Sequence, residues 1–153
     1  MESIIHLAQI NIARMRAPID SPVMAGFVAQ LDAINTLAES SPGFIWRLVG
    51  EGNDATSLRP FDDDFIIVNM SVWQSLEDLR AYVYKSAHTA VMRRRREWFE
   101  QFESAFVALW WVAAGHIPTV GEAKQRLLRL EAHGPTAEAF TFKQPFAPLI
   151  AVR

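Results

Sequence analysis

The chain has 153 residues, of which half are hydrophobic and 21% are charged, the composition of an ordinary globular domain rather than of a disordered chain. The formal net charge of −2 gives no general attraction for nucleic acids or anionic membranes, and we expect neither as a partner. Cysteine is absent, which excludes a disulfide framework and thiolate chemistry. The sequence shows no signal peptide and no apolar stretch long enough to span a membrane, so we expect a cytoplasmic protein.

Alternation and helical spacing predict strands and helices in a definite order along the chain. The predicted strands are 4–13, 43–49, 65–73 and 105–114. The predicted helices are one that begins at Val23 and ends in the segment 40–43, a long one at about 75–102, and a short amphipathic one at 119–132. A polar loop rich in Gly, Asn, Asp and Pro covers about 50–64, and residues 140–142 are a candidate for a last short strand.

This order of elements predicts an α+β fold with the ferredoxin-like split βαβ arrangement, in which both long helices cover one face of an antiparallel sheet. We interpret the whole chain, 1–153, as a single domain with about 119–153 as a C-terminal appendage. The opposite sheet face would be bare, and Ile45, Val49 and Ile67 would form an apolar patch there. A second copy of the chain packed on this patch would cover it. We therefore expect a homodimer that forms a dimeric α/β barrel.

The first strand carries two amides on one face. Gln9 and Asn11 are two residues apart, and side chains alternate across a strand, so these two point the same way. The residues that share the opposite, apolar face are Ala8, Ile10 and Ile12. We expect this apolar face to pack on the helices and the amides to point into the barrel, where they pair with each other or with a ligand.

Two further strands add polar groups to the expected barrel face. These are Arg47 and Asn69, each with apolar neighbours in the same alternation. A buried guanidinium needs an anionic partner, which is either a ligand carboxylate or phosphate, or a protein carboxylate among residues 62–64. An apolar cavity with a few converging polar groups is the usual anatomy of a small-molecule site.

The aromatic residues and the histidine of the predicted site come from the last strand and the long helix. Trp110 and Trp111 alternate, so one faces the barrel and the other the helices. Tyr84 and His88 lie one turn apart on the helix, and His88 flanks its apolar stripe, at the mouth of the barrel. The arginine run 93–96 spreads around a helix and forms no single basic face, which argues against nucleic-acid binding. The histidines show no spacing of a metal site.

Several stretches closely resemble one bacterial family, the domain of unknown function 3291 family. They are LAQINIARMRAPID, SPGFIWRL, RPFDDD, VNMSVWQSLEDLRAYVYKSAH, MRRRREWFEQF and LWWVAAGHIPTVGEAKQRL, which together cover nearly the whole chain. The resemblance implies the dimeric α/β-barrel superfamily, which also holds antibiotic-biosynthesis monooxygenases and haem-degrading monooxygenases. It implies no particular reaction, because none is assigned to the family.

The haem-degrading members suggest one specific alternative. They use an asparagine on the first strand and a histidine on the second helix as the iron ligand, and Asn11 and His88 occupy similar places here. Those enzymes also carry a tryptophan about ten residues before the histidine, which this chain lacks. In this alternative His88 is the axial ligand of haem, and Tyr84 and Arg95 flank the macrocycle.

The sequence therefore leads to a main hypothesis and two alternatives. The main hypothesis is a monooxygenase-like enzyme that acts on a flat, partly apolar organic substrate without a bound cofactor or metal. His88 and Asn11 would be catalytic in it. The substrate-binding residues would be Gln9, Arg47, Asn69, Tyr84, Trp110 and Trp111. The alternatives are a haem-binding protein and a non-catalytic binding or structural dimer.

Overall fold

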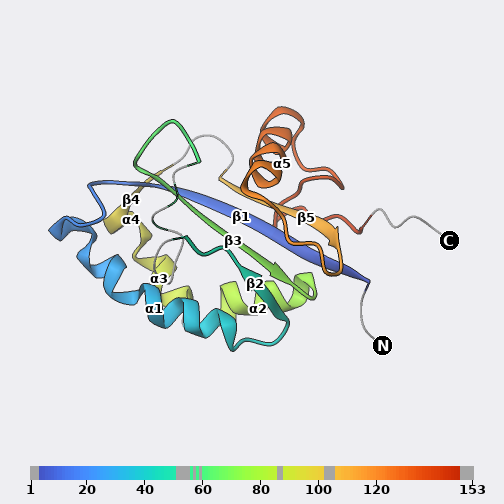
Figure 1. Ribbon diagram of the computed structural model, residues 1–153, viewed down its shortest axis with the longest axis horizontal. Helices are drawn as coiled ribbons and strands as arrows, with labels where there is room; N and C mark the ends of the chain where they lie inside the picture. Colours follow the sequence, from blue (N-terminus) through green and yellow to red (C-terminus); the bar gives the residue numbers. More distant parts are fainter. Residues whose placement is uncertain are drawn as a thin grey trace.

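An antiparallel sheet forms the centre of the computed structural model, which describes residues 4–50, 56, 58, 60–85, 88–101 and 106–148. Its strands are β1 (Ile5–Met15), β2 (Phe44–Arg47), β3 (Ile66–Trp73), β4 (Phe99–Glu100) and β5 (Val107–Ala113). The order is β2-β3-β1, and β4 and β5 both pair with the remaining edge of β1 (Figure 1). This arrangement confirms the predicted α+β, ferredoxin-like fold.

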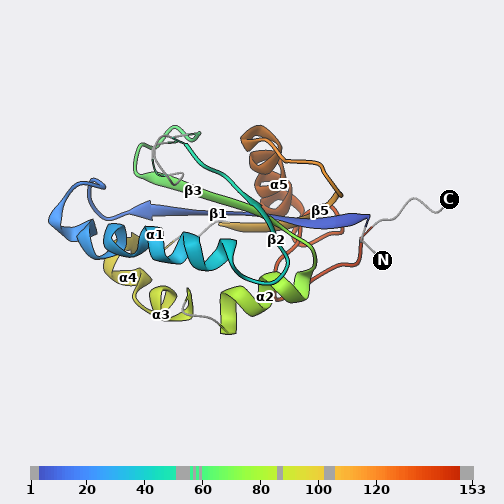
Figure 2. The same cartoon turned by 60° about the horizontal axis from the view of Figure 1, so that its bottom comes forward.

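The helices form two layers, one on each side of the sheet. One face carries the short η1 (Pro22–Met24) and four helices, which are α1 (Ala25–Glu39), α2 (Leu76–Lys85), α3 (His88–Arg93) and α4 (Arg95–Trp98). The C-terminal helix α5 (Val120–His133) lies alone on the opposite face (Figure 2). We call these two faces the α1 side and the α5 side. Within the described residues, no helix has the length and apolar character that a membrane span needs.

The prediction of one long helix at 75–102 is wrong, because this part of the chain forms α2, α3, α4 and β4. The chain turns at Arg94, whose φ of −96° and ψ of 4° separate α3 from α4. This turn brings Trp98 inward, where it is 2% exposed and packs with Met24. The following β4 pairs with the end of β1. Burial of a large indole and the added strand pairing both favour the turn over a continuous helix.

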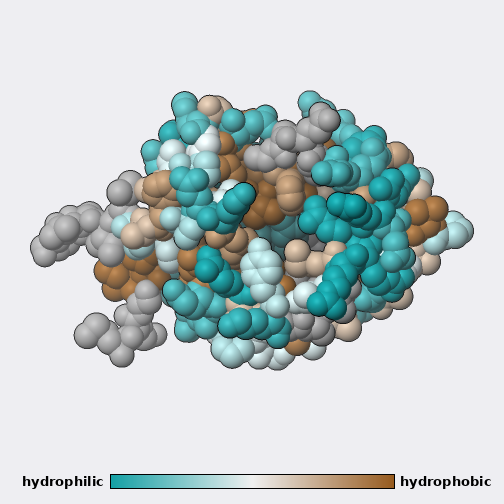
Figure 3. All heavy atoms as spheres, turned by 180° about the vertical axis from the view of Figure 1, so that it is seen from behind, coloured by the Kyte–Doolittle hydropathy of each residue, from teal (hydrophilic) through white to brown (hydrophobic). Residues whose placement is uncertain are grey.

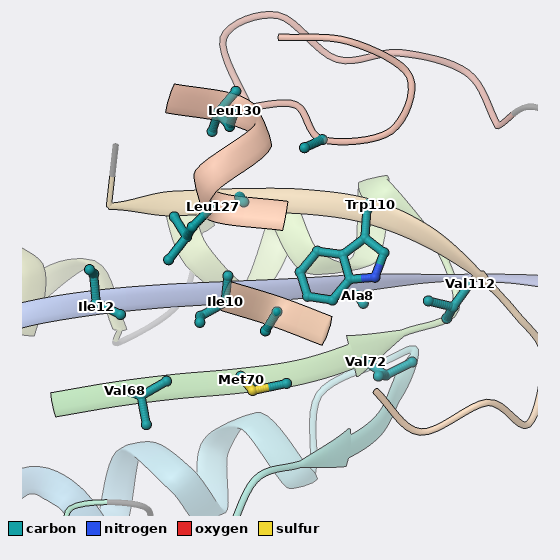
Figure 4. Packing of buried hydrophobic residues seen from close by; sticks show 13 residues of the cluster. Ala8, Ile10, Ile12, Val68, Met70, Val72, Trp110, Val112, Leu127 and Leu130 are labelled. Carbon is teal, nitrogen blue, oxygen red and sulfur yellow. The ribbon is translucent and has the colours of Figure 1, made fainter. Parts of the chain in front are cut away.

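The α5 side holds the largest buried cluster. The residues that share this face are Ala8, Ile10, Ile12, Val68, Met70, Val72, Ala108, Trp110 and Val112. Leu127 and Leu130 of α5 cover them (Figure 4). The prediction that the apolar face of β1 packs on the first two long helices is therefore wrong. The appended helix has its own apolar stripe, and this stripe covers that face instead.

The expected apolar patch on a bare sheet face is also absent. Ile45 packs into the α5-side cluster, whereas Ile67 is buried on the α1 side, and Val49 is 44% exposed. Ile10 and Met70, in the middle of the α5 side, have no exposed surface within one chain. A second copy is therefore not needed to cover this face, which removes the reason for a dimer joined sheet to sheet.

The side chains at the start of the predicted strand 43–49 do not alternate regularly between the two faces of the sheet. Phe44 pairs with Trp73 and Trp46 pairs with Val72, with an irregularity of register between them. Phe44 consequently lies on the α1 side and Trp46 on the α5 side. One extra residue in a strand reverses the faces of the residues that precede it.

The C-terminal segment is held by α5 and by one bridge to the sheet. Thr119 caps α5 by accepting a hydrogen bond from the backbone of Glu122, and the helix runs to His133, close to the predicted range 119–132. Phe140 and Leu109 then exchange two backbone hydrogen bonds of 2.8 Å. The proposed last strand is thus a single bridge, which carries the chain around β5 to the α1 side.

Candidate functional site

The α1 side of β1 is apolar at both ends and polar in the middle. Leu7 at one end belongs to a buried cluster with Trp73, Leu79, Leu109 and Phe140. Met15 at the other end belongs to a second cluster, with Met24, Ile67 and Trp98. Between these clusters lie the side chains of Gln9, Asn11, Asn69 and Ser71, which we call the amide patch. This patch is the candidate functional site.

Strand register places the amide patch. Gln9 is opposite Ser71 and Asn11 is opposite Asn69, and residues directly opposite each other share a face. Sequence analysis predicted correctly that the two amides of β1 share a face. The prediction that this face looks into a barrel between two sheets is wrong, because the clusters on this face include residues of α1, α2 and α4. A ligand would therefore lie between the sheet and the helices of one chain.

The patch is linked by hydrogen bonds. The Gln9 Nε2 amide donates to Asn69 Oδ1 and to Ser71 Oγ, both at 2.8 Å. The Asn11 Nδ2 amide donates to Gln9 Oε1 at 3.0 Å and to Asn69 Oδ1 at 3.1 Å. The indole Nε1 of Trp73 donates to Ser71 Oγ at 2.8 Å. These bonds fix the orientation of the asparagine and glutamine side chains.

Two groups of the patch keep unused hydrogen-bonding capacity. Within the described residues, neither Asn11 Oδ1 nor Asn69 Nδ2 has a partner. Asn69 is exposed although β3 is flanked by β1 and β2, and Asn11 is half-buried. The patch therefore presents an acceptor and a donor side by side, at a place that solvent or a ligand reaches.

Arg47 lies beside the patch but is paired within the chain. It is opposite Ser71 on β2, is 8% exposed, and its Nε is 2.9 Å from Glu39 Oε2. Of the two partners left open by the sequence, the protein carboxylate is present, but it comes from α1 and not from residues 62–64. Asp63 pairs instead with Arg14, whose hydrogen bond, together with one from the Phe65 backbone, holds the pKa of Asp63 below its ordinary value.

Two residues of the helices on the α1 side were not predicted from the sequence. Tyr82 of α2 stacks on Trp73 with 5.1 Å between ring centroids, and its hydroxyl donates to the Ile34 carbonyl at 3.3 Å. Burial raises the pKa of Tyr82, although Arg47 opposes this, so the hydroxyl is a donor and not a base at neutral pH. Asn35 is an 8% exposed amide on α1, one turn before Glu39. The sequence feature that could have identified Asn35 is the presence of an asparagine among the residues of that helix that face the protein interior.

The two tryptophans of β5 lie on opposite faces, as predicted. Trp110 is fully buried on the α5 side, where its Nε1 donates to Glu122 Oε2 at 3.0 Å, and it is not part of the patch. Trp111 is on the α1 side, opposite Leu7, and its Nε1 donates to the Phe146 carbonyl at 2.8 Å.

The helix residues of the prediction do not gather at the patch as one group. Tyr84 is 51% exposed and meets the ring of Phe142 edge-on at 5.5 Å, so it packs on the C-terminal segment. His88 begins α3, and its side chain lies outside the described residues. Its predicted role as acid, base or ligand stays a prediction.

The groups proposed to flank a haem are not assembled in the described part of the chain. Tyr84 and Arg95 were expected one and two turns from His88 on a continuous helix, but the chain turns at Arg94, between α3 and Arg95. Arg95 lies over the ring of Phe106 at 5.2 Å, and Tyr84 contacts Phe142. Among the described residues, no three histidine, aspartate or glutamate side chains come together as a metal site. The haem alternative itself stays a prediction, because it depends on His88, whose side chain lies outside the described residues.

Solved structures of low sequence identity share the fold that the sheet and the helices on the α1 side form. SnoaB, a cofactor-independent oxygenase from Streptomyces nogalater, is 17% identical, with a TM-score of 0.50 over 74% of this chain and 98% of SnoaB. Rv0793 from Mycobacterium tuberculosis is 16% identical, with a TM-score of 0.50 over 74% of this chain and 99% of Rv0793. At these identities the similarity establishes the fold alone.

The sequence profile of the domain of unknown function family DUF3291 matches residues 6–151, and the chain belongs to this family. This confirms the resemblance seen in the sequence. No protein with a curated description matches the sequence significantly.

Proposed function

We propose that this protein is a monooxygenase-like enzyme that binds a flat, partly apolar organic molecule at the amide patch and needs no bound cofactor. The observation that carries the proposal is the accessible pair formed by Asn11 Oδ1 and Asn69 Nδ2, set between two aromatic-rich clusters. The fold it shares with SnoaB, a cofactor-independent oxygenase, supports the reaction class.

The patch suits a neutral ligand that carries both a carbonyl and a hydroxyl group. Asn69 Nδ2 would donate to the carbonyl oxygen, and Asn11 Oδ1 would accept from the hydroxyl. Arg47 is already paired with Glu39, so an anionic ligand gains no free charge from it. The flat apolar part would lie between the aromatic residues of the flanking clusters.

The proposed reaction converts an activated methylene to a carbonyl. One oxygen atom of dioxygen becomes the new carbonyl oxygen, and the other leaves as water with the two hydrogens of the methylene. The substrate supplies all four electrons, so the balance needs no external reductant. Donation from Asn69 to the substrate oxygen would stabilise the enolate that forms when the methylene loses its proton. His88 is the proposed acid–base group.

The test combines ligand binding with dioxygen uptake, using a panel of bicyclic and tricyclic hydroxylated aromatic ketones as probes. We expect a member of the panel to quench tryptophan fluorescence on binding and to be consumed with one equivalent of dioxygen. Asn69→Ala is expected to weaken binding about tenfold, because one ligand hydrogen bond is lost. Gln74→Ala, which removes an exposed amide just after β3, is the matched control and is expected to bind normally.

The result separates the proposal from its rivals. Binding without dioxygen uptake would identify a non-catalytic binding protein. Equal affinity of wild type and Asn69→Ala would show that the patch is not the site. His88→Ala is expected to slow dioxygen uptake while binding stays within about twofold of wild type.

A homodimer is a further part of the proposal. The interface that we propose lies outside the α5 side of the sheet, where Ile10 and Met70 are already fully buried within one chain. The candidate site lies within one chain, so binding at the patch does not require a second copy.

A further inference from the structure

A cavity of about 510 Å³ opens at the edge of the sheet, and its described lining shares no residue with the amide patch. It lies beside β4, which pairs with the end of β1, and beside Phe106, which precedes β5. Its lining includes Arg16, Arg95, Arg96, Phe99, Glu100 and Phe106. Figure 3 shows this side of the molecule, where hydrophilic side chains gather over α3 and α4 beside a recess with hydrophobic atoms.

The three arginines at the cavity have no carboxylate partner among the described residues. Arg16 Nε donates to the backbone carbonyl of Arg96 at 2.7 Å, and Arg95 lies over the ring of Phe106 at 5.2 Å. Among the described residues of the lining, the carboxylate is Glu100, which is paired with Arg14. The described lining residues thus carry three positive charges and one negative charge.

The turn at Arg94 explains why neighbouring arginines have different surroundings. Arg94 pairs with Glu97 at 2.9 Å and lies over Trp98 at 4.9 Å, so its charge is compensated locally. Arg95 and Arg96, in the separate helix α4, line the cavity instead. A continuous helix would have spread these side chains around its circumference.

The composition of the lining identifies the chemistry of a ligand. Guanidinium groups hold carboxylate and phosphate oxygens through paired hydrogen bonds, and three of them beside one carboxylate favour a ligand with two negative charges. The Phe99 and Phe106 rings offer an apolar surface in the same cavity. The volume lies within the range of about 300–1,000 Å³ that small-molecule sites have.

We propose that this cavity is a second binding site, and that it takes a compact phosphate monoester with an aromatic or similarly flat apolar group. The phosphate would lie among Arg16, Arg95 and Arg96, and the apolar group would lie against Phe99 and Phe106. The described residues of this site are different from those of the amide patch.

The test is isothermal titration of the full chain at low salt with phenyl phosphate as the probe. Inorganic phosphate and phenol are titrated as its two separate halves. We expect one site that binds phenyl phosphate at least about tenfold more tightly than inorganic phosphate, and no detectable binding of phenol. Binding is expected to weaken as sodium chloride is raised, because the recognition is largely electrostatic.

Two variants with the same change in net charge locate the site. Arg96→Gln keeps the backbone carbonyl that Arg16 uses, and it is expected to weaken phenyl phosphate binding about tenfold. Arg93→Gln removes an exposed arginine of the same run that does not line the cavity, and it is expected to change the affinity less than about twofold. Circular dichroism of both variants checks that the fold is unchanged.

Three outcomes would overturn the proposal. These are equal losses of affinity in Arg93→Gln and Arg96→Gln, equal affinities for phenyl phosphate and inorganic phosphate, and tight binding of a single-stranded oligonucleotide without binding of phenyl phosphate. The last outcome would identify a surface for a phosphate backbone rather than a small-molecule site.

Discussion

Arg47 on β2 and Glu39 at the end of α1 form an ion pair that joins the sheet to its first helix, with 2.9 Å between Nε and Oε2. The arginine side chain is 6% exposed and the glutamate side chain is 47% exposed, so a buried charge is compensated from the surface. This geometry gives Arg47 a structural role beside the amide patch.

Replacement of Glu39 is expected to destabilise the fold. Glu39→Gln removes one negative charge that pairs with a buried guanidinium, and we expect the free energy of unfolding to fall by about 1–2 kcal/mol, less than for a fully buried pair. Urea denaturation measures the change. Glu131→Gln, an exposed carboxylate on α5, is the control and is expected to stay within about 0.5 kcal/mol of wild type. An unchanged midpoint for Glu39→Gln would contradict the structural role.

The hydrogen bond from Trp73 to Ser71 predicts a coupled pair of substitutions. Ser71→Ala leaves the buried indole N–H of Trp73 without its acceptor, and we expect a loss of about 1–3 kcal/mol in unfolding free energy. In the background of Trp73→Phe, which lacks this donor, the same serine change is expected to cost less. A double-mutant cycle measures the difference, and additive effects would show that the bond contributes little.

Gly43 and Gly115 separate the cost of backbone conformation from the cost of a steric clash. Both have positive φ, +83° and +90°. A Cβ atom at Gly43 would overlap the Asp78 side chain, whereas one at Gly115 meets nothing within 4 Å. We expect Gly115→Ala to cost about 1–2 kcal/mol and Gly43→Ala clearly more, as measured by thermal denaturation. Equal costs would mean that the α1–β2 turn adjusts freely.

We expect Glu122 to make the free energy of unfolding depend on pH. Burial raises the pKa of this carboxylate, but hydrogen bonds from His116 and Trp110 outweigh burial and hold the pKa below its ordinary value of 4.5. A carboxylate with a lowered pKa in the folded state stabilises the fold above the unfolded value and loses this contribution as pH falls through the folded value.

The measurement compares wild type with Glu122→Gln by chemical denaturation between pH 7 and pH 3. We expect wild type to be the more stable protein at neutral pH, with a difference that is constant down to about pH 5.5 and shrinks below about pH 4.5. A difference that grew on acidification would contradict the lowered pKa.

Self-association is measured by sedimentation equilibrium at micromolar concentration. The expected dimer has twice the monomer mass of 17.3 kDa. Because the α5-side residues are covered within one chain, the interface is expected to lie elsewhere, and Leu128→Glu on the outer surface of α5 tests whether that surface takes part. A monomer mass for the wild-type chain would end the dimer prediction.

Local patterns in the sequence determined the elements and much of the candidate site. Alternation alone placed Gln9 and Asn11 on one face of the first strand, and helical spacing predicted the last helix at 119–132, close to the observed Val120–His133. These features depend on neighbours within a few residues, so the sequence specifies them directly.

Only the tertiary structure decided which way each face points. Alternation gives a strand two faces but does not say which helix covers which face, and α5 competes with the earlier helices for the apolar one. Burial of Trp98 broke a helix that local propensity would have continued, and it separated Arg94 from Arg95 and Arg96. Arg47 likewise found its partner in Glu39 rather than in the nearby aspartates. Each outcome depends on contacts between segments distant in sequence, where burial and charge compensation outweigh local preference.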